Sequence, residues 1–206
     1  MHWRVEPDEL AVLLPEQLSL DRHDGEAWLG ITPFRVSALR LRGLPPVPVL
    51  SSFPEVNART YVTYQEKPGI WFFSLDAASP WAVGAARRTY HLPYHHARIT
   101  DRRRGERIDY RSEREGAVLD VEYRPTGAPS PPRPGALEHF LTERYCLYTE
   151  YRGRLERADI HHRPWPLQTA EADVRENTLA PIALDGDPLL HYSERQDVVI
   201  WPLERL

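Results

Sequence analysis

The sequence predicts a mainly β (α+β) fold, built as an antiparallel closed sheet with a few peripheral helices. Segments with strand patterns are short and numerous, and only two or three segments carry helical signals. The chain has 206 residues, which is long enough to bury a sizeable core without cross-links. We therefore expect residues 1–206 to form a single domain.

The first half of the chain contains two helical signals and three strand-like segments. Pro7 with two acidic residues after it is typical of a first helical turn, and Ser79 followed by Pro80 is a second helix start. A turn over 66–69 is expected to join two strands. The expected elements are a helix over 7–14, strands over 27–36, 57–65 and 69–77, an irregular proline-rich loop over 43–54, and a helix over 80–90.

The second half of the chain reads as a meander followed by further strands. Arg104-Gly105 and Glu115-Gly116 are its turn signals. Residues 170–177 fit either a helix or a strand. The other expected elements are strands over 94–101, 106–113 and 117–124, a surface loop over 125–135, a helix over 136–143, and strands over 145–151, 155–161 and 198–201.

Composition and charge narrow the class of function. The formal net charge is −4, which is not the basic excess of nucleic-acid-binding proteins, and no apolar run approaches the ~20 residues of a membrane span. Cys146 is the sole cysteine, so no intrachain disulfide is expected. The N-terminal residues lack a signal-peptide pattern. We expect a cytoplasmic protein with no nucleic acid and no membrane partner.

Histidines are the main candidates for a metal site. His91, His95 and His96 follow the second predicted helix, and His161-His162 form another adjacent pair. Neighbouring residues of a strand point to opposite faces, so neither pair presents two ligands to one metal ion. Surface or structural histidines are the alternative. We predict no metal site and no cofactor.

Glu55 precedes a predicted strand on which Asn57, Arg59 and Tyr61 share one face. A carboxylate with a guanidinium four residues further on can orient a small polar ligand at the mouth of a closed sheet. An exposed loop glutamate is the alternative, and spacing does not decide between the two.

Long stretches of the chain resemble a known family. FPEVNARTYV, GIWFFSLDA, AARRTYHLPYHHAR, LEHFLTERYCLY and IHHRPWPL resemble the YqjF-like family, domain-of-unknown-function family 2071, over nearly the whole chain. That family belongs with the acetoacetate decarboxylase-like superfamily. The resemblance implies a cone-like antiparallel β barrel with a central cavity, and superfamily members assemble into oligomers, which leaves a homo-oligomer open here.

The resemblance also implies positions for a site. Glu55 falls at the catalytic-site glutamate of the decarboxylase, Tyr94 at its reactive lysine and His95 at the neighbouring lysine, with Arg87 in the stretch just before them. The superfamily's active-site arginine has no counterpart in the chain. Tyrosine cannot form an imine, and the sole lysine, Lys67, is expected in a hydrated hairpin turn. Schiff-base decarboxylation is therefore disfavoured.

Two functions remain open from the sequence. The first is binding of a small carbonyl or carboxylate compound in the barrel cavity, with Asn57, Arg59 and Arg87 as ligand contacts. The alternative is a general acid–base enzyme, a lyase or hydrolase, in which Glu55 is the base and Tyr94 or His95 the acid. A fold alone does not separate a binding module from an enzyme.

Overall fold

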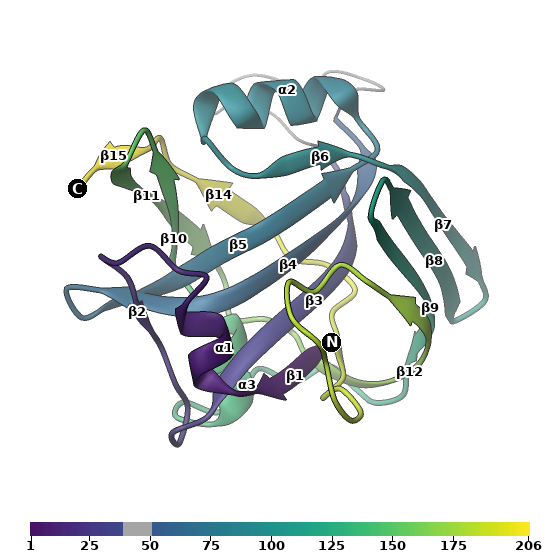
Figure 1. Ribbon diagram of the computed structural model, residues 1–206. Coiled ribbons are helices and arrows are strands. Elements are labelled where there is room, and N and C mark those ends of the chain that lie inside the picture. The colour runs from purple at the N-terminus through teal and green to yellow at the C-terminus, as the bar shows by residue number, and fades with distance from the viewer. Residues whose placement is uncertain (39–50) are drawn as a thin grey trace.

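The computed structural model describes residues 1–38 and 51–206, which form two β-sheets with three short helices (Figure 1). The predicted mainly β class is correct. The closed barrel is wrong for the described residues, whose strands divide into a ten-stranded and a five-stranded sheet. Residues 43–50 of the predicted proline-rich loop lie outside the described residues, and Phe53 and Pro54 already belong to a strand.

The large sheet has the order β1-β3-β4-β5-β10-β11-β14, with β2, β6 and β15 paired beside it. Its pairings are antiparallel except β5 with β10 and β5 with β6, which are parallel. These two exceptions correct the fully antiparallel prediction. Its strands are β1 His2–Val5, β2 Ser19–Leu20, β3 Ala27–Val36, β4 Phe53–Tyr64, β5 Lys67–Ala77, β6 Tyr94–His96, β10 Cys146–Tyr151, β11 Arg154–His162, β14 Val198–Ile200 and β15 Glu204–Arg205.

The small sheet has the order β13-β12-β9-β8-β7 and contains the predicted meander. The expected strand over 94–101 breaks at Ala97, so its first residues join the large sheet and the rest join the small one. The ambiguous segment 170–177 is a strand. The members of this sheet are β7 Arg98–Arg104, β8 Arg107–Arg114, β9 Ala117–Pro125, β12 Gln168–Asn177 and β13 His191–Tyr192.

Three helices lie where the sequence predicts them: α1 Pro7–Ala11, α2 Pro80–Thr89 and α3 Leu137–Thr142. The hydroxyl of Ser79 accepts a hydrogen bond from the Ala82 amide, which satisfies one free donor at the start of α2. Figure 1 shows α2 above β6, so the chain returns to the edge of β5 directly after the helix. That return explains why β5 and β6 are parallel.

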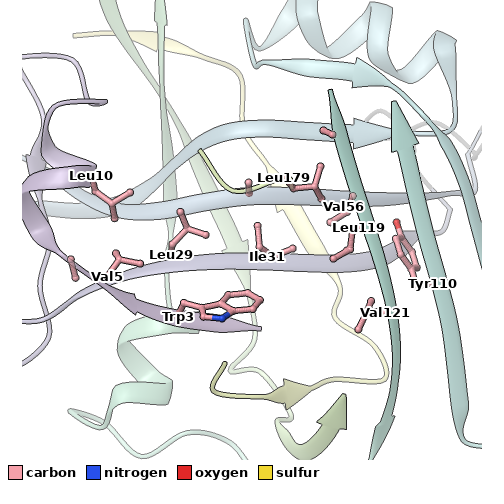
Figure 2. Close-up of a cluster of buried hydrophobic side chains, with 13 residues drawn as sticks. Trp3, Val5, Leu10, Leu29, Ile31, Val56, Tyr110, Leu119, Val121 and Leu179 are labelled. Atoms are coloured by element: carbon pink, nitrogen blue, oxygen red, sulfur yellow. The ribbon is translucent and has the colours of Figure 1, made fainter. Parts of the chain in front are cut away.

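The main core fills the space between the two sheets (Figure 2). Leu29, Ile31 and Val56 point from β3 and β4 towards Leu119 and Val121 of β9, and all five are at most 1% exposed. Alternate residues of β3 and β4 are therefore committed to this core. The opposite face of the same strands is free to carry polar side chains.

The β4–β5 hairpin turns more tightly than predicted. The turn residues are Gln65 and Glu66, both with positive φ (47° and 63°), which is the backbone of a type I′ turn. Lys67 therefore begins β5 instead of lying in the turn. Its ammonium contacts Asp159 at 2.7 Å, an ion pair that the sequence did not predict.

Gly69 provides a sharp stability test of this hairpin. A Cβ at Gly69 would lie 2.6 Å from the Tyr148 ring and 2.7 Å from the Cys146 sulfur. We expect Gly69→Ala to lower the free energy of unfolding by about 3 kcal/mol through overpacking. Gly84→Ala in α2 is the matched control, because its Cβ meets only the Arg88 guanidinium at 3.6 Å, and a helical alanine adds up to about 1 kcal/mol. Urea titration measures both; equal effects would contradict the prediction.

Candidate functional site

The candidate site lies on the face of β4 that is turned away from the main core. Val56 and Ala58 point into that core, so Glu55, Asn57 and Arg59 point to the opposite side. The register extends this face across the sheet. Asn57 is paired with Leu75 of β5, and Leu75 is paired in turn with Tyr94 of β6.

Glu55 and Tyr94 are in direct contact, although they are far apart in the sequence. The Tyr94 hydroxyl lies 3.1 Å from Glu55 Oε1 and 3.2 Å from Oε2, close enough to donate to either oxygen. Glu55 is only 3% exposed. The expected closeness of these two side chains is thus present. Glu55 is a buried residue of β4, so the exposed loop glutamate, the alternative that the sequence left open, does not apply.

Burial dominates the protonation of this pair. It raises the pKa of Glu55 to about 8; the Tyr94 hydrogen bond opposes that rise, and the charge of Asp76 adds to it. Burial, followed by the charge of Glu55, also raises the pKa of Tyr94 well above its usual value. Both groups are therefore protonated at pH 7, and Glu55 can exchange a proton close to neutral pH.

Asn57 and Arg59 extend the polar face away from Glu55. Asn57 is 5% exposed, and its Oδ1 atom has no hydrogen-bond partner among the described residues. The buried Nε of Arg59 also lacks one there. Buried polar atoms without partners are rare in folded proteins. This stretch of β4 therefore offers an acceptor and a donor to a ligand.

Two residues expected at the site lie elsewhere. His95 is paired with Asp76 in the register, so it points to the other face of the sheet from Tyr94. Burial, and then the charge of Arg114, lowers the pKa of His95. Arg87 is exposed, and its Nε donates to the Tyr94 carbonyl at 2.6 Å. It fixes the backbone that carries Tyr94, while its guanidinium remains at the surface.

Sequence reasoning missed the ion pair behind the site. Asp76 is fully buried on the face opposite Glu55, and Arg114 Nε donates to its two oxygens at 2.8 and 2.9 Å. Arg114 comes from β8 of the small sheet, so this pair joins the two sheets next to Glu55. No local signal in the sequence links the two residues, because they meet only through tertiary packing.

Three further properties bear on the kind of site. Within residues 1–38 and 51–206, no three histidine, cysteine or acidic side chains come together as metal ligands. None of the helices in the described part of the chain is long and apolar enough to span a membrane. A surface hollow lined by Asp159 and 201–204 lies away from Glu55. It is open to solvent, so the buried, dehydrated Glu55–Tyr94 pair is the stronger candidate.

Comparisons with known proteins identify relatives of the sequence and of the fold. A protein of Bacillus subtilis strain 168, named Uncharacterized protein YqjF, is 47% identical over 211 residues, covering 99% of this chain and 87% of that protein. A solved structure of acetoacetate decarboxylase is similar to this protein with a TM-score of 0.64 and 13% identity. The match covers 100% of this chain and 84% of the decarboxylase chain. The enduracididine biosynthesis enzyme MppR matches with a TM-score of 0.60 and 16% identity, over 99% of this chain and 83% of the MppR chain.

At these identities the two solved structures establish the fold alone, which is acetoacetate decarboxylase-like. The family assignment rests on the sequence. A family model described as "Uncharacterized conserved protein", DUF2071, matches residues 1–197, nearly the full length of the chain. Together with the close relative YqjF, this match shows that the chain belongs to the DUF2071 family.

Proposed function

We propose that this protein binds a small carbonyl or carboxylate compound on the face of β4 that is turned away from the main core. The observation that carries the proposal is the buried Glu55–Tyr94 hydrogen bond, with the unpartnered Asn57 oxygen next along the strand. A protonated carboxyl and a phenol both donate hydrogen bonds, which suits a ligand carbonyl oxygen. Oriented polar groups on a dehydrated face select such a ligand over water.

One structural neighbour supports this class of ligand. The MppR structure was determined in complex with pyruvate, a small 2-oxo acid. The carbonyl group of such an acid matches the donors that Glu55 and Tyr94 supply. The comparison is a likeness of fold, so the ligand of this chain remains a proposal based on its own side chains.

The proposed chemistry does not pass through a lysine imine. Position 94, where the resemblance puts the reactive lysine, is tyrosine. Lys67 begins β5 and forms an ion pair with Asp159. Tyr94 lies beside Leu75, near the other end of β5, and an extended strand from Lys67 to Leu75 is about 25 Å long. An ammonium held by a carboxylate is a poor nucleophile.

The second candidate function is general acid–base catalysis on the same compound, as a lyase or hydrolase. The specific observation that favours it is the Glu55 pKa of about 8, which allows the carboxyl group to give and take a proton near neutral pH. Tyr94 would then act as the hydrogen-bond donor that stabilises developing negative charge on a carbonyl oxygen.

Glu55→Gln tests the site directly. We expect a small molecule to co-purify with the wild-type protein and to be lost from this variant, because the amide cannot change between hydrogen-bond donor and acceptor by losing or gaining a proton. The measurement is mass spectrometry of compounds released from both proteins, followed by incubation of each compound with fresh protein. Consumption of the compound by wild type alone favours the enzyme, and retention without consumption favours the binder.

The matched control is Glu156→Gln. Glu156 lies on β11, is also a buried glutamate, and pairs with His91 instead of with Tyr94. This control should retain the compound. Equal retention by the wild-type protein and Glu55→Gln would contradict the proposed function.

A further inference from the structure

A second group of polar side chains, two of them buried and two partly buried, lies further along the face that carries Glu55. It consists of His2 from β1, Arg59 and Tyr61 from β4, and His191 from β13. The His2 ring centroid lies 6.4 Å from that of Tyr61 and 6.3 Å from that of His191. Gly30 lies beneath them, since a Cβ there would be 3.2 Å from His2 and 3.4 Å from Arg59.

These side chains present polar atoms that the described residues leave without partners. They are both ring nitrogens of His2, Nε of Arg59, the Tyr61 hydroxyl and Nδ1 of His191. His2 is 5% exposed and Tyr61 is fully buried. Leaving so many polar atoms unbonded in one place is costly. Nε of Arg59, the Tyr61 hydroxyl and one ring nitrogen of neutral His2 can each donate a hydrogen bond to an acceptor.

The charge around this group is unbalanced. Arg59 forms no ion pair with any residue in the described ranges. The nearby guanidinium of Arg144 is already paired with Asp21. One carboxylate, Glu138 on α3, lies 3.9 Å from His191, but it is about two-fifths exposed. An anion among the four side chains would both balance Arg59 and accept the unused hydrogen bonds.

We propose that His2, Arg59, Tyr61 and His191 form an anion subsite that holds the carboxylate of the ligand, while the ligand carbonyl lies at Glu55 and Tyr94. This inference rests on the proposed function for the carbonyl end only. Residues 55 and 59 are separated by about 13 Å of extended strand. The reach of the Glu55 and Arg59 side chains covers part of that distance, and the ligand has to bridge the rest. Pyruvate, whose carboxylate is directly bonded to its carbonyl carbon, is too short, so the five-carbon 2-oxoglutarate is the probe.

Calorimetric titration with 2-oxoglutarate, pyruvate and inorganic phosphate tests the subsite. We expect wild type to bind 2-oxoglutarate more tightly than pyruvate, and Arg59→Met to weaken 2-oxoglutarate binding by about 30-fold or more. Tyr61→Phe, which removes only the hydroxyl, should weaken it by a smaller factor. Arg4→Gln, on the exposed side of β1, changes the net charge equally and should leave binding unchanged.

Three results would overturn the subsite. They are unaltered 2-oxoglutarate affinity in Arg59→Met, no saturable 2-oxoglutarate binding to wild type, and binding of phosphate in its place. The Glu55→Gln variant separates the two proposals. If Arg59→Met loses 2-oxoglutarate and Glu55→Gln does not, the subsite stands and the proposed carbonyl site fails; the reverse result removes the subsite alone.

Thermal unfolding without ligand gives an independent readout. Arg59 is partly buried, and its enclosed Nε has no partner among the described residues, which costs stability. Arg59→Met should therefore melt at a higher temperature than wild type. A structural arginine would behave in the opposite way, and a lower melting temperature would count against the subsite. Should Arg59→Met fail to fold, judged by circular dichroism, Arg59→Lys and Tyr61→Phe carry the same binding test.

Discussion

Replacing Asp76 by alanine is expected to lower the free energy of unfolding by about 3–5 kcal/mol. The carboxylate is fully buried, and both of its oxygens accept from Arg114 Nε. Alanine would leave the Arg114 guanidinium, itself about one-fifth exposed, without its counter-charge between the two sheets. Chemical denaturation of the wild-type protein and the variant at pH 7 measures the loss.

Two further variants show whether charge pairing causes this loss. Burial raises the pKa of Asp76 even though Arg114 opposes the rise, so dehydration outweighs pairing for this carboxyl group. An apolar pair can replace such a buried ion pair at little cost. The double variant Asp76→Leu with Arg114→Met should therefore recover most of the stability, while Arg114→Met alone should not. A loss below about 1 kcal/mol in Asp76→Ala would contradict the argument.

The second large effect is a dependence of stability on pH that comes from Glu55. Its pKa is raised from 4.5 to about 8 on folding, so the folded state holds its proton more tightly than the unfolded state. The stability associated with this protonated carboxyl is complete below pH 4.5 and is lost as the pH rises towards 8. The difference between the pKa values of the unfolded and folded states corresponds to a change of about 5 kcal/mol in the free energy of unfolding.

Glu55→Gln removes this dependence, because the amide does not titrate. The variant should match wild type near pH 4.5 and exceed its stability by several kcal/mol at pH 9. Tyr94→Phe is the informative control. The Tyr94 hydrogen bond lowers the pKa of Glu55, so its removal should extend the loss of stability to higher pH. Urea titrations at pH 5, 7 and 9 measure these differences, and parallel profiles for wild type and Glu55→Gln would contradict the assignment.

Local signals in the sequence predicted most of the individual elements. The strand Ala27–Val36 has the predicted bounds, because a turn signal precedes it and its residues favour extended backbone. The strand His2–Val5 was missed, since four residues carry little pattern and it exists through its pairing with β3. The break at Ala97 and the division into two sheets depend on tertiary packing, which no local pattern records.

The site was predictable only in part, and for physical reasons. The closeness of Glu55 and Tyr94 was expected from the family resemblance and from the start of two strands at one sheet edge. His95 was wrongly placed with them, because the alternation of a strand sends it to the face of Asp76. Tyr61 was expected on the face of Asn57 and Arg59, but His2 and His191 were not considered, since their contacts join strands that are distant in the sequence.

The alternation along β4 also has an evolutionary consequence. Val56 and Ala58 pack in the core between the two sheets, while the residues that alternate with them, Glu55, Asn57 and Arg59, contribute to no part of that core. A lineage can therefore exchange one chemistry for another by substituting every second position of a single strand. Two descendants could diverge completely in the molecules that they recognise while their folded shapes stayed nearly the same.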